Sequence, residues 1–227
     1  MTEMIDTNKK ALIVSGGQTD PEQLRQQIAI LRAAEGLLIA ADSGLEVLDQ
    51  LGCLPDVAVG DFDSVDPQVL DRFQRQEQIR FERHRPEKNE TDTELAFSIA
   101  QEAGVTEIIL MGATGTRLDH VLSNVHLLKS AMDRGLDCRI LDPHNRIRLV
   151  CGRTAFYKDA DAYPFVSLVP LTMEVTGITL TGFKYPLQDH DLVLGQECGL
   201  CVSNELAAEE AVLDFTSGLL LVIEARD

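Results

Sequence analysis

The sequence predicts an α/β protein in which a largely parallel α/β/α domain is followed by a small antiparallel β-sandwich. In the first part of the chain, short apolar runs alternate with longer amphipathic stretches, which indicates strands and helices in turn. After about residue 145 the helical periodicity ends, and short β-rich runs separated by Gly, Pro and Asp take its place. We therefore predict two domains, 1–145 and 146–227.

The strands expected in the first domain are short and mainly apolar, as buried strands of a covered sheet should be. They are ALIVSG (11–16), GLLIAAD (36–42), DVAVGD (56–61), IRFER (79–83), VTEIILMGA (105–113) and CRILD (138–142).

Helix signals lie between these runs, and two of them show where a helix begins. Pro67 follows Asp66 and occupies a first-turn position, where proline is allowed. Thr91 and Glu94 have the spacing of a capping box. The expected helices are 21–34, 45–52, a helix opened by Asp66 and Pro67, 91–104, and 120–135.

The second domain is expected to consist of strands alone. Its β-rich runs are RIRLVCG (146–152), FVSLVPL (165–171), VTGITLTG (175–182), LCVSNEL (200–206), AVLDFTSG (211–218) and LLLVIEA (219–225).

Composition narrows the class of protein. The chain has 227 residues, of which 44% are hydrophobic, so it can bury a sizeable core. Its formal charge of −17 argues against binding to nucleic acid and to anionic membranes. No apolar run is long enough to span a bilayer, and the amino terminus MTEMIDTNKK has no signal-peptide core. We therefore expect a cytoplasmic protein.

The five cysteines do not predict a disulfide framework, because their number is odd. Cys198 and Cys201 form a single CxxC, but a structural zinc site needs four ligands, and the sequence offers no matching second pair. We expect these thiols to be buried or incidental.

Four aspartates stand where a strand should end or a helix should begin: Asp42, Asp61, Asp63 and Asp92. In an open α/β sheet such positions line one crevice, where ligands bind. Carboxylates gathered there would repel one another unless a hard cation lay among them, and oxygen ligands suit Mg²⁺ or Ca²⁺. The less specific interpretation is that Asp42 and Asp92 are helix caps.

The chain contains neither a Walker A motif nor G-x-G-x-x-G, so a standard phosphate loop is excluded. The segment GATGTRLDHVLSN instead offers Gly112 and Gly115, beside which backbone amides can approach an anion, and then Arg117 near a helix amino terminus. An arginine fork can hold phosphate oxygens in pairs, and Lys88 could add a second positive charge. Alternatively, Arg117 and Asp119 form a surface ion pair, and His120 and His126 lie on a helix without a functional role.

The segments PDVAVGDFDS, TDTELA, GATGTRLDHVLSN and VSNEL, taken in this order, resemble thiamine pyrophosphokinase across nearly the whole chain. The resemblance implies an α/β nucleotide-binding catalytic domain and a β-sandwich that binds thiamine and dimerises. It also implies transfer of a diphosphate from ATP to the thiamine hydroxyl, which gives thiamine diphosphate and AMP. Thiamine is expected between the α/β domain of one subunit and the β domain of the other in a homodimer.

The resemblance assigns roles to residues of this chain. The catalytic acids would be Asp42, Asp61, Asp63 and Asp92, with Mg²⁺ held by Asp61, Asp63 and Asp92. The ATP-binding residues would be Lys88, Thr91, Gly112, Arg117, Asp119, His120 and Asn124. Ser203 and Asn204 match the pair that contacts thiamine. The family often has an aromatic residue such as Trp near the carboxyl terminus, whereas this chain has no Trp and has Leu221 in that place.

Two other functions compete with this prediction. DFDS after a strand is similar to the nucleophile motif of haloacid-dehalogenase-type phosphohydrolases, but the DGT continuation is absent. A non-enzymatic nucleotide or thiamine sensor would not need all four acids.

Overall fold

The structure is a computed structural model, and the residues described are 9–84, 90–158 and 163–227. The chain divides into two compact units, Met1–Pro143 and His144–Asp227. This division falls two residues before the boundary expected from the sequence, just ahead of the strand β7 (Asn145–Val150).

The first unit is built on a parallel sheet with the strand order β6–β5–β1–β2–β3–β4. Non-consecutive neighbours such as β1 and β5 are parallel, which requires crossover connections. The strands are β1 (Lys10–Val14), β2 (Leu37–Ala41), β3 (Val57–Gly60), β4 (Arg80–Arg83), β5 (Glu107–Met111) and β6 (Asp137–Leu141).

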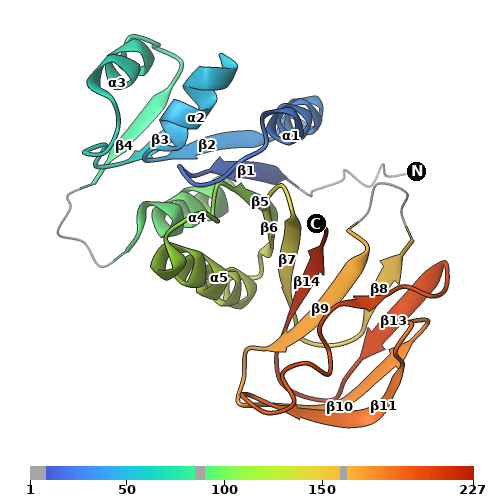
Figure 1. Ribbon diagram of the computed structural model, residues 1–227. Helices are drawn as coiled ribbons and strands as arrows, with labels where there is room; N and C mark the ends of the chain where they lie inside the picture. Colours follow the sequence, from blue (N-terminus) through green and yellow to red (C-terminus); the bar gives the residue numbers. More distant parts are fainter. Residues whose placement is uncertain (1–8, 85–89, 159–162) are drawn as a thin grey trace, which may run out of the picture. The chain divides into compact units, whose positions relative to one another are not determined.

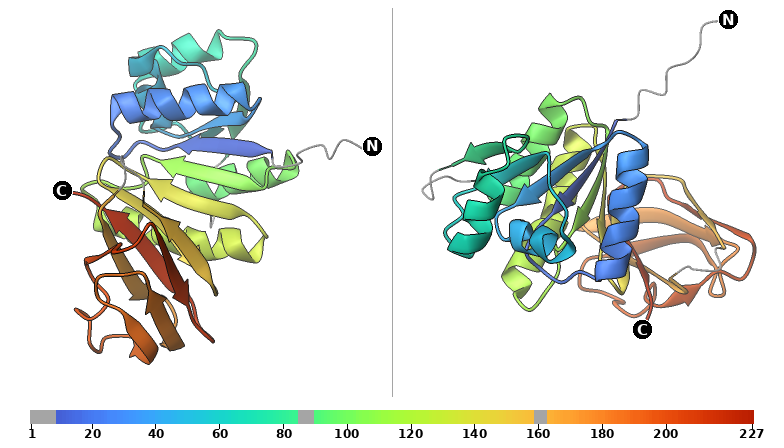
Figure 2. Two further views of the ribbon diagram at one scale, coloured as in Figure 1. Left: turned by 90° about the vertical axis from the view of Figure 1, so that its right-hand side faces the viewer. Right: turned by 90° about the horizontal axis from the view of Figure 1, so that it is seen from above.

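Helices cover both faces of this sheet, as Figures 1 and 2 show. The helices α1 and α2 pack on one face, with α3 beside α2, while α4 and α5 lie on the other. Their bounds are α1 (Pro21–Ala33), α2 (Gly44–Leu51), α3 (Pro67–Gln74), α4 (Asp92–Glu102) and α5 (Leu118–Asp133). The predicted α/β architecture of this part of the chain is confirmed.

Local side-chain bonds fix where these helices begin. Asp66 accepts a hydrogen bond from the backbone N–H of Gln68 at 2.7 Å, directly before Pro67. Thr91 accepts one from the backbone N–H of Glu94 at 3.2 Å. Both satisfy amide groups that a helix amino terminus leaves without partners, so the two helix starts predicted from the sequence are confirmed.

One buried cluster of the first unit lies between β1, β2 and the helices α1 and α2 on one face of the sheet. Strands β1 and β2 are buried at four of five positions each, because both of their faces are covered. Leu12 and Leu38 of these strands pack with Leu24 of α1 and Leu48 of α2. This packing holds the carboxyl ends of the strands, and the loops that follow them, in place.

The second unit contains antiparallel strands in two layers, in the orders β12–β9–β14–β7 and β11–β10–β13–β8. Residues from both layers form one buried cluster, for example Val166 and Val222 with Val175 and Leu213. The second-domain prediction of an antiparallel sandwich is therefore confirmed. The remaining bounds are β8 (Thr154–Tyr157), β9 (Phe165–Pro170), β10 (Glu174–Thr181), β11 (Leu187–Val193), β12 (Asn204–Glu205), β13 (Glu210–Asp214) and β14 (Leu220–Ala225).

The sequence interpretation missed two strands of this unit, β8 and β11. They are the edge strands of their layer, and only one of the seven residues of β11 is buried, so its sequence LQDHDLV lacks the apolar alternation of an inner strand. The expected strand LCVSNEL is mostly wrong: only Asn204 and Glu205 pair with β9, and the residues before them form turns.

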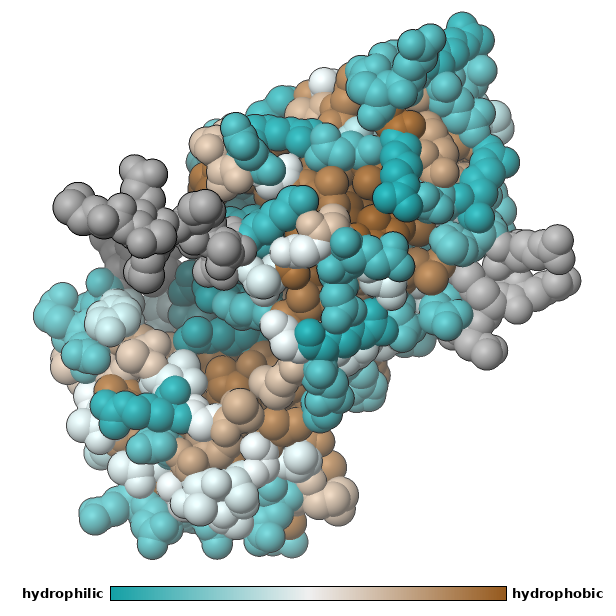
Figure 3. Space-filling model, turned by 180° about the vertical axis from the view of Figure 1, so that it is seen from behind, coloured by the Kyte–Doolittle hydropathy of each residue, from teal (hydrophilic) through white to brown (hydrophobic). Residues whose placement is uncertain are grey.

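Hydrophilic residues cover much of the face shown in Figure 3, with smaller hydrophobic areas between them. Across the described part of the chain, no helix is both long and apolar enough to cross a membrane.

Candidate active site

A cavity of about 650 Å³ opens in the first unit at the carboxyl ends of its strands. Four segments line it: 15–17 after β1, 41–43 after β2, 91–93 at the start of α4, and 112–117 with the adjoining side of α5. Loops after parallel strands and the amino ends of helices therefore meet at one place, as expected for the ligand crevice of an open α/β sheet.

Most of the predicted nucleotide-binding residues border this cavity. They are Thr91, Gly112, Arg117, Asp119, His120 and Asn124, together with the acids Asp42 and Asp92. Lys88 lies outside the described residues.

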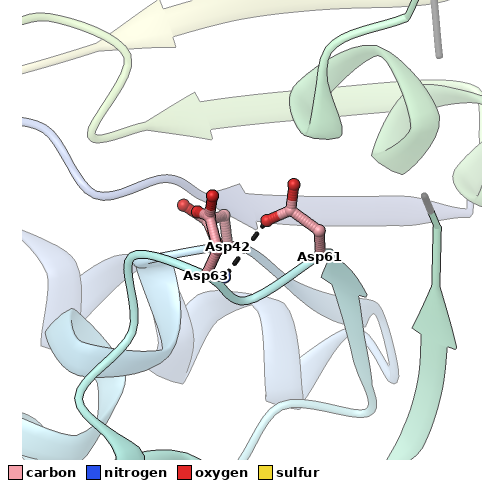
Figure 4. A group of neighbouring side chains, drawn as sticks. All are labelled: Asp42, Asp61 and Asp63. Carbon is pink, nitrogen blue, oxygen red and sulfur yellow. Dashed lines mark hydrogen bonds between the residues drawn. The ribbon is translucent and has the colours of Figure 1, made fainter. Parts of the chain in front are cut away.

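Three of the four predicted catalytic aspartates form a compact cluster. Ligand oxygens of Asp42, Asp61 and Asp63 lie within 4.8 Å of one another. Figure 4 shows their carboxylates on the same side of the loop that carries Asp61 and Asp63. Asp92 lies outside this cluster of three, which we call the acid cluster, but it lines the cavity.

The carboxylates of the acid cluster repel one another. The pKa of Asp63 is raised above its ordinary value, chiefly by the negative charge of Asp61, then by desolvation, and further by the charge of Asp42. The charge of Asp92 adds a smaller effect in the same direction. Asp63 donates its backbone N–H to Asp61 Oδ1 at 3.1 Å, which offsets part of the repulsion.

Asp42 is held in an unusual conformation. Its φ of 48° lies in the left-handed region, and its backbone N–H donates to the carbonyl oxygen of Val59 at 2.8 Å. Its Oδ2 accepts a hydrogen bond from the hydroxyl of Ser64 at 2.5 Å. Its Oδ1 is buried and has no hydrogen-bond partner among the described residues.

Burying a carboxylate oxygen without a hydrogen-bond partner raises the free energy of the folded protein, and a cation beside that oxygen would offset the increase. The other two acids of the cluster supply further oxygen ligands, which suit Mg²⁺. The donor set therefore fits the predicted metal ion.

The loops around the cavity touch one another through glycines, a feature that the sequence interpretation missed. A Cβ atom on Gly16 would lie 2.0 Å from Ser43 Oγ, and one on Gly17 would lie 2.2 Å from the carbonyl oxygen of Thr114. Gly112 has a φ of 70°, and a Cβ there would lie 2.0 Å from the carbonyl oxygen of Ser15. The only sequence signal for the first of these loops is a Gly-Gly pair directly after a strand.

Arg117 and Asp119 form the ion pair that the less specific interpretation predicted. The guanidinium of Arg117 donates to both carboxylate oxygens, at 2.6 and 3.3 Å. The pair lowers the pKa of Asp119 and raises that of Arg117. Both side chains are exposed at the cavity, so a phosphate could compete with Asp119 for the fork.

Asn124 has a supporting contact. Its amide Nδ2 donates to the carbonyl oxygen of Ala113 at 2.8 Å, which ties α5 to the loop that carries Gly112.

Ser203 and Asn204 lie in the second unit. Ser203 has a φ of 57° and donates its backbone N–H to Ser167 Oγ at 3.0 Å. Asn204 is buried, and its side chain bonds the backbone of Tyr185. Leu221 is also buried, within β14, so its side chain is not available to stack on a ligand ring.

All five cysteines are free thiols. Cys198 is exposed and Cys201 is buried, which raises the pKa of Cys201 to about 11. Neither belongs to a group of potential metal ligands found in the described residues.

Comparison with known proteins identifies both units. Residues 29–140 match the family model "Thiamin pyrophosphokinase, catalytic domain", and residues 154–220 match "Thiamin pyrophosphokinase, vitamin B1 binding domain". The chain is 33% identical over 216 residues to thiamine pyrophosphokinase of Bacillus subtilis (strain 168), which covers 95% of this chain and 98% of that protein.

Solved structures agree. The crystal structure of thiamine pyrophosphokinase from Bacillus subtilis superposes with a TM-score of 0.84 at 31% identity, covering 96% of this chain and all of the other. The corresponding structure from Geobacillus thermodenitrificans gives 0.80 at 33% identity, covering 96% and 98% of the two chains. The chain therefore belongs to the thiamine pyrophosphokinase family, and it is an enzyme of that family.

Proposed function

We propose that this enzyme transfers a diphosphate from ATP to the hydroxyl of thiamine and releases AMP. The observation that carries the proposal is the acid cluster of Asp42, Asp61 and Asp63, of which Asp42 lines the cavity, within the unit that matches the catalytic model of the family. The cavity, at about 650 Å³, is within the usual size range of small-ligand sites.

The proposed metal ion is Mg²⁺, held by Asp61 and Asp63 and by the unpartnered oxygen of Asp42. Asp92, the third metal ligand that the resemblance implied, lies outside this cluster and lines the cavity, so we do not place it on the metal. When bound, the ion supplies positive charge that neutralises phosphate oxygens as charge develops on them. The acids themselves need no covalent step, because this class of transfer depends on positioning and charge neutralisation.

We assign proton acceptance to Asp92. It lines the cavity but is not one of the three acids of the cluster, so its carboxylate is the one least committed to metal binding. A carboxylate in that position can take the proton of the attacking hydroxyl as the new P–O bond forms.

The phosphates of ATP are proposed to lie along the loop with Gly112, against the start of α5. Thr91, His120 and Asn124 border the same space. Arg117 would exchange its carboxylate partner Asp119 for phosphate oxygens, since its fork fits either anion.

The second unit is proposed to bind thiamine, on the strength of its match to the vitamin B1 binding model. Ser203 and Asn204 are the proposed contact segment. We further infer that the protein is a homodimer and that it lies in the cytoplasm, with ATP and thiamine as its substrates. Sedimentation of the purified chain would test the oligomeric state.

The direct test is incubation with ATP, Mg²⁺ and thiamine, followed by mass analysis of the products. We expect thiamine diphosphate and AMP in equal amounts, and none from an Asp61→Asn variant. Thiamine monophosphate with ADP would contradict the proposal. The comparisons give no support to the haloacid-dehalogenase alternative or to the sensor alternative. Trapping of a phospho-aspartate on this chain would be evidence for the haloacid-dehalogenase alternative.

A further inference from the structure

We infer that Ser64 is a positioning residue of the active site: its hydroxyl holds one oxygen of Asp42 so that the other is presented to the cation. This inference rests on the proposed function, since it concerns the same acid cluster. It assigns Ser64 a role through Asp42 and no contact with substrate.

The two carboxylate oxygens of Asp42 have different surroundings. Ser64 Oγ donates to Oδ2 at 2.5 Å, a length typical of a strong bond from a hydroxyl to a carboxylate. Oδ1 is buried and has no hydrogen-bond partner among the described residues. A hydroxyl that fixes one oxygen therefore also fixes the direction in which the unpartnered oxygen points.

The bond also opposes charge repulsion between two segments of the chain. Asp42 follows β2, whereas Asp61, Asp63 and Ser64 follow β3. The like charges of these acids drive the segments apart, because their ligand oxygens lie within 4.8 Å of one another. Ser64 is placed among the acids of its own segment and donates to the acid of the other, so it holds the two together.

A second bond joins the same two segments without touching the acid cluster. The backbone N–H of Asp66 donates to Glu46 Oε1 at 2.7 Å, with Glu46 four residues after Asp42 and Asp66 two residues after Ser64. This bond provides a control, because its loss should loosen the loop but leave the Asp42 carboxylate bonded to Ser64.

The test is metal binding by the full chain in the absence of substrates. Mn²⁺ would be titrated as an electron-spin-resonance probe into the wild type, Ser64→Ala, Ser64→Thr and Glu46→Ala. We expect Ser64→Ala to weaken binding on the order of tenfold, as is usual when a group that orients a metal ligand is lost. Ser64→Thr keeps the hydroxyl and should stay near the wild type, and so should Glu46→Ala.

Equal Mn²⁺ affinity of Ser64→Ala and the wild type would overturn the inference. So would an equal loss in Glu46→Ala, because it would show that only loop anchoring matters. If Ser64→Ala does not fold, Ser64→Cys takes its place, since a thiol is similar in size but a weak donor. Thiamine diphosphate formation by the wild type is measured separately. If the product forms but Ser64→Ala binds Mn²⁺ as tightly as the wild type, only the positioning role of Ser64 is wrong. If no product forms, the proposed function is wrong.

Discussion

The side chain of Asn204 bonds both polar groups of the Tyr185 backbone. Asn204 Oδ1 accepts from the N–H of Tyr185 at 3.0 Å, and Nδ2 donates to its carbonyl oxygen at 2.8 Å. The same Oδ1 accepts from the backbone N–H of Glu205 at 2.9 Å. Asn204 is 5% exposed while Tyr185 is 58% exposed, so a buried amide fixes the backbone of an exposed aromatic residue. The Asn204 side chain thus has a structural task beside its proposed position near thiamine.

We therefore predict that Asn204→Ala destabilises the protein by about 1–3 kcal/mol, because buried backbone groups lose their partner. Asn204→Asp should destabilise it at least as much at neutral pH, because it buries a charge and turns a carboxylate oxygen towards the carbonyl oxygen of Tyr185. Denaturant unfolding of both variants would measure this. Unchanged stability of Asn204→Ala would show that water replaces the amide.

The sequence predicted the convergence of Asp42, Asp61 and Asp63, because the carboxyl ends of parallel strands share one edge of a sheet. It also predicted the Thr91 cap, which depends on residues three apart. These features follow from local order and from a general rule of topology.

Other features depend on partners that are distant in the sequence. The bond from Asn204 reaches a residue 19 positions away, and Gly17 contacts Thr114, which is 97 positions away, at the wall of the cavity. Edge strand β11 was missed because it has a neighbouring strand on one side only, and its largely polar sequence lacks the pattern of a buried strand. No pattern within a short window shows these contacts.

Asp63→Asn should abolish product formation while leaving the metal-free fold as stable as the wild type or more so. The pKa of Asp63 is raised in the folded protein, so its ionised form is disfavoured there. A group of this kind stabilises the fold below its unfolded pKa, and that stabilisation is lost as the pH rises through the folded pKa. The advantage of the variant should therefore be present at neutral pH and shrink on acidification.

Thermal melts in EDTA at neutral pH and near pH 4 would measure this difference. Asp133→Asn is a suitable control, because Asp133 pairs with Lys129 on α5 and its loss should not raise the melting temperature. A neutral-pH melting temperature of Asp63→Asn below that of the wild type would contradict the prediction.

Arg117→Lys should lower kcat/KM for ATP by roughly tenfold, because lysine keeps the charge but cannot form the two-pronged contact with phosphate oxygens. Asp119→Asn tests the competing ion pair from the other side. It frees the fork of Arg117 from a charged partner, so ATP binding should stay level or tighten. Steady-state kinetics with ATP varied at saturating thiamine would measure both effects. Unchanged ATP kinetics in Arg117→Lys would place Arg117 outside the site.

Gly112→Ala should destabilise the protein more than Gly135→Ala does, although the two glycines have nearly equal φ angles of 70° and 73°. Both variants carry the strain of a left-handed alanine, about 1–2 kcal/mol. At Gly112 the new Cβ would lie 2.0 Å from the carbonyl oxygen of Ser15, whereas at Gly135 it would meet no atom of the other described residues within 4 Å, its chain neighbours aside. The difference in unfolding free energy between the variants therefore isolates the contact of the loops after β1 and β5. We expect about 1–3 kcal/mol, the usual cost of overpacking, together with a rise in KM for ATP in Gly112→Ala alone. Equal stability of the two variants would show that the loop after β1 moves aside at little cost.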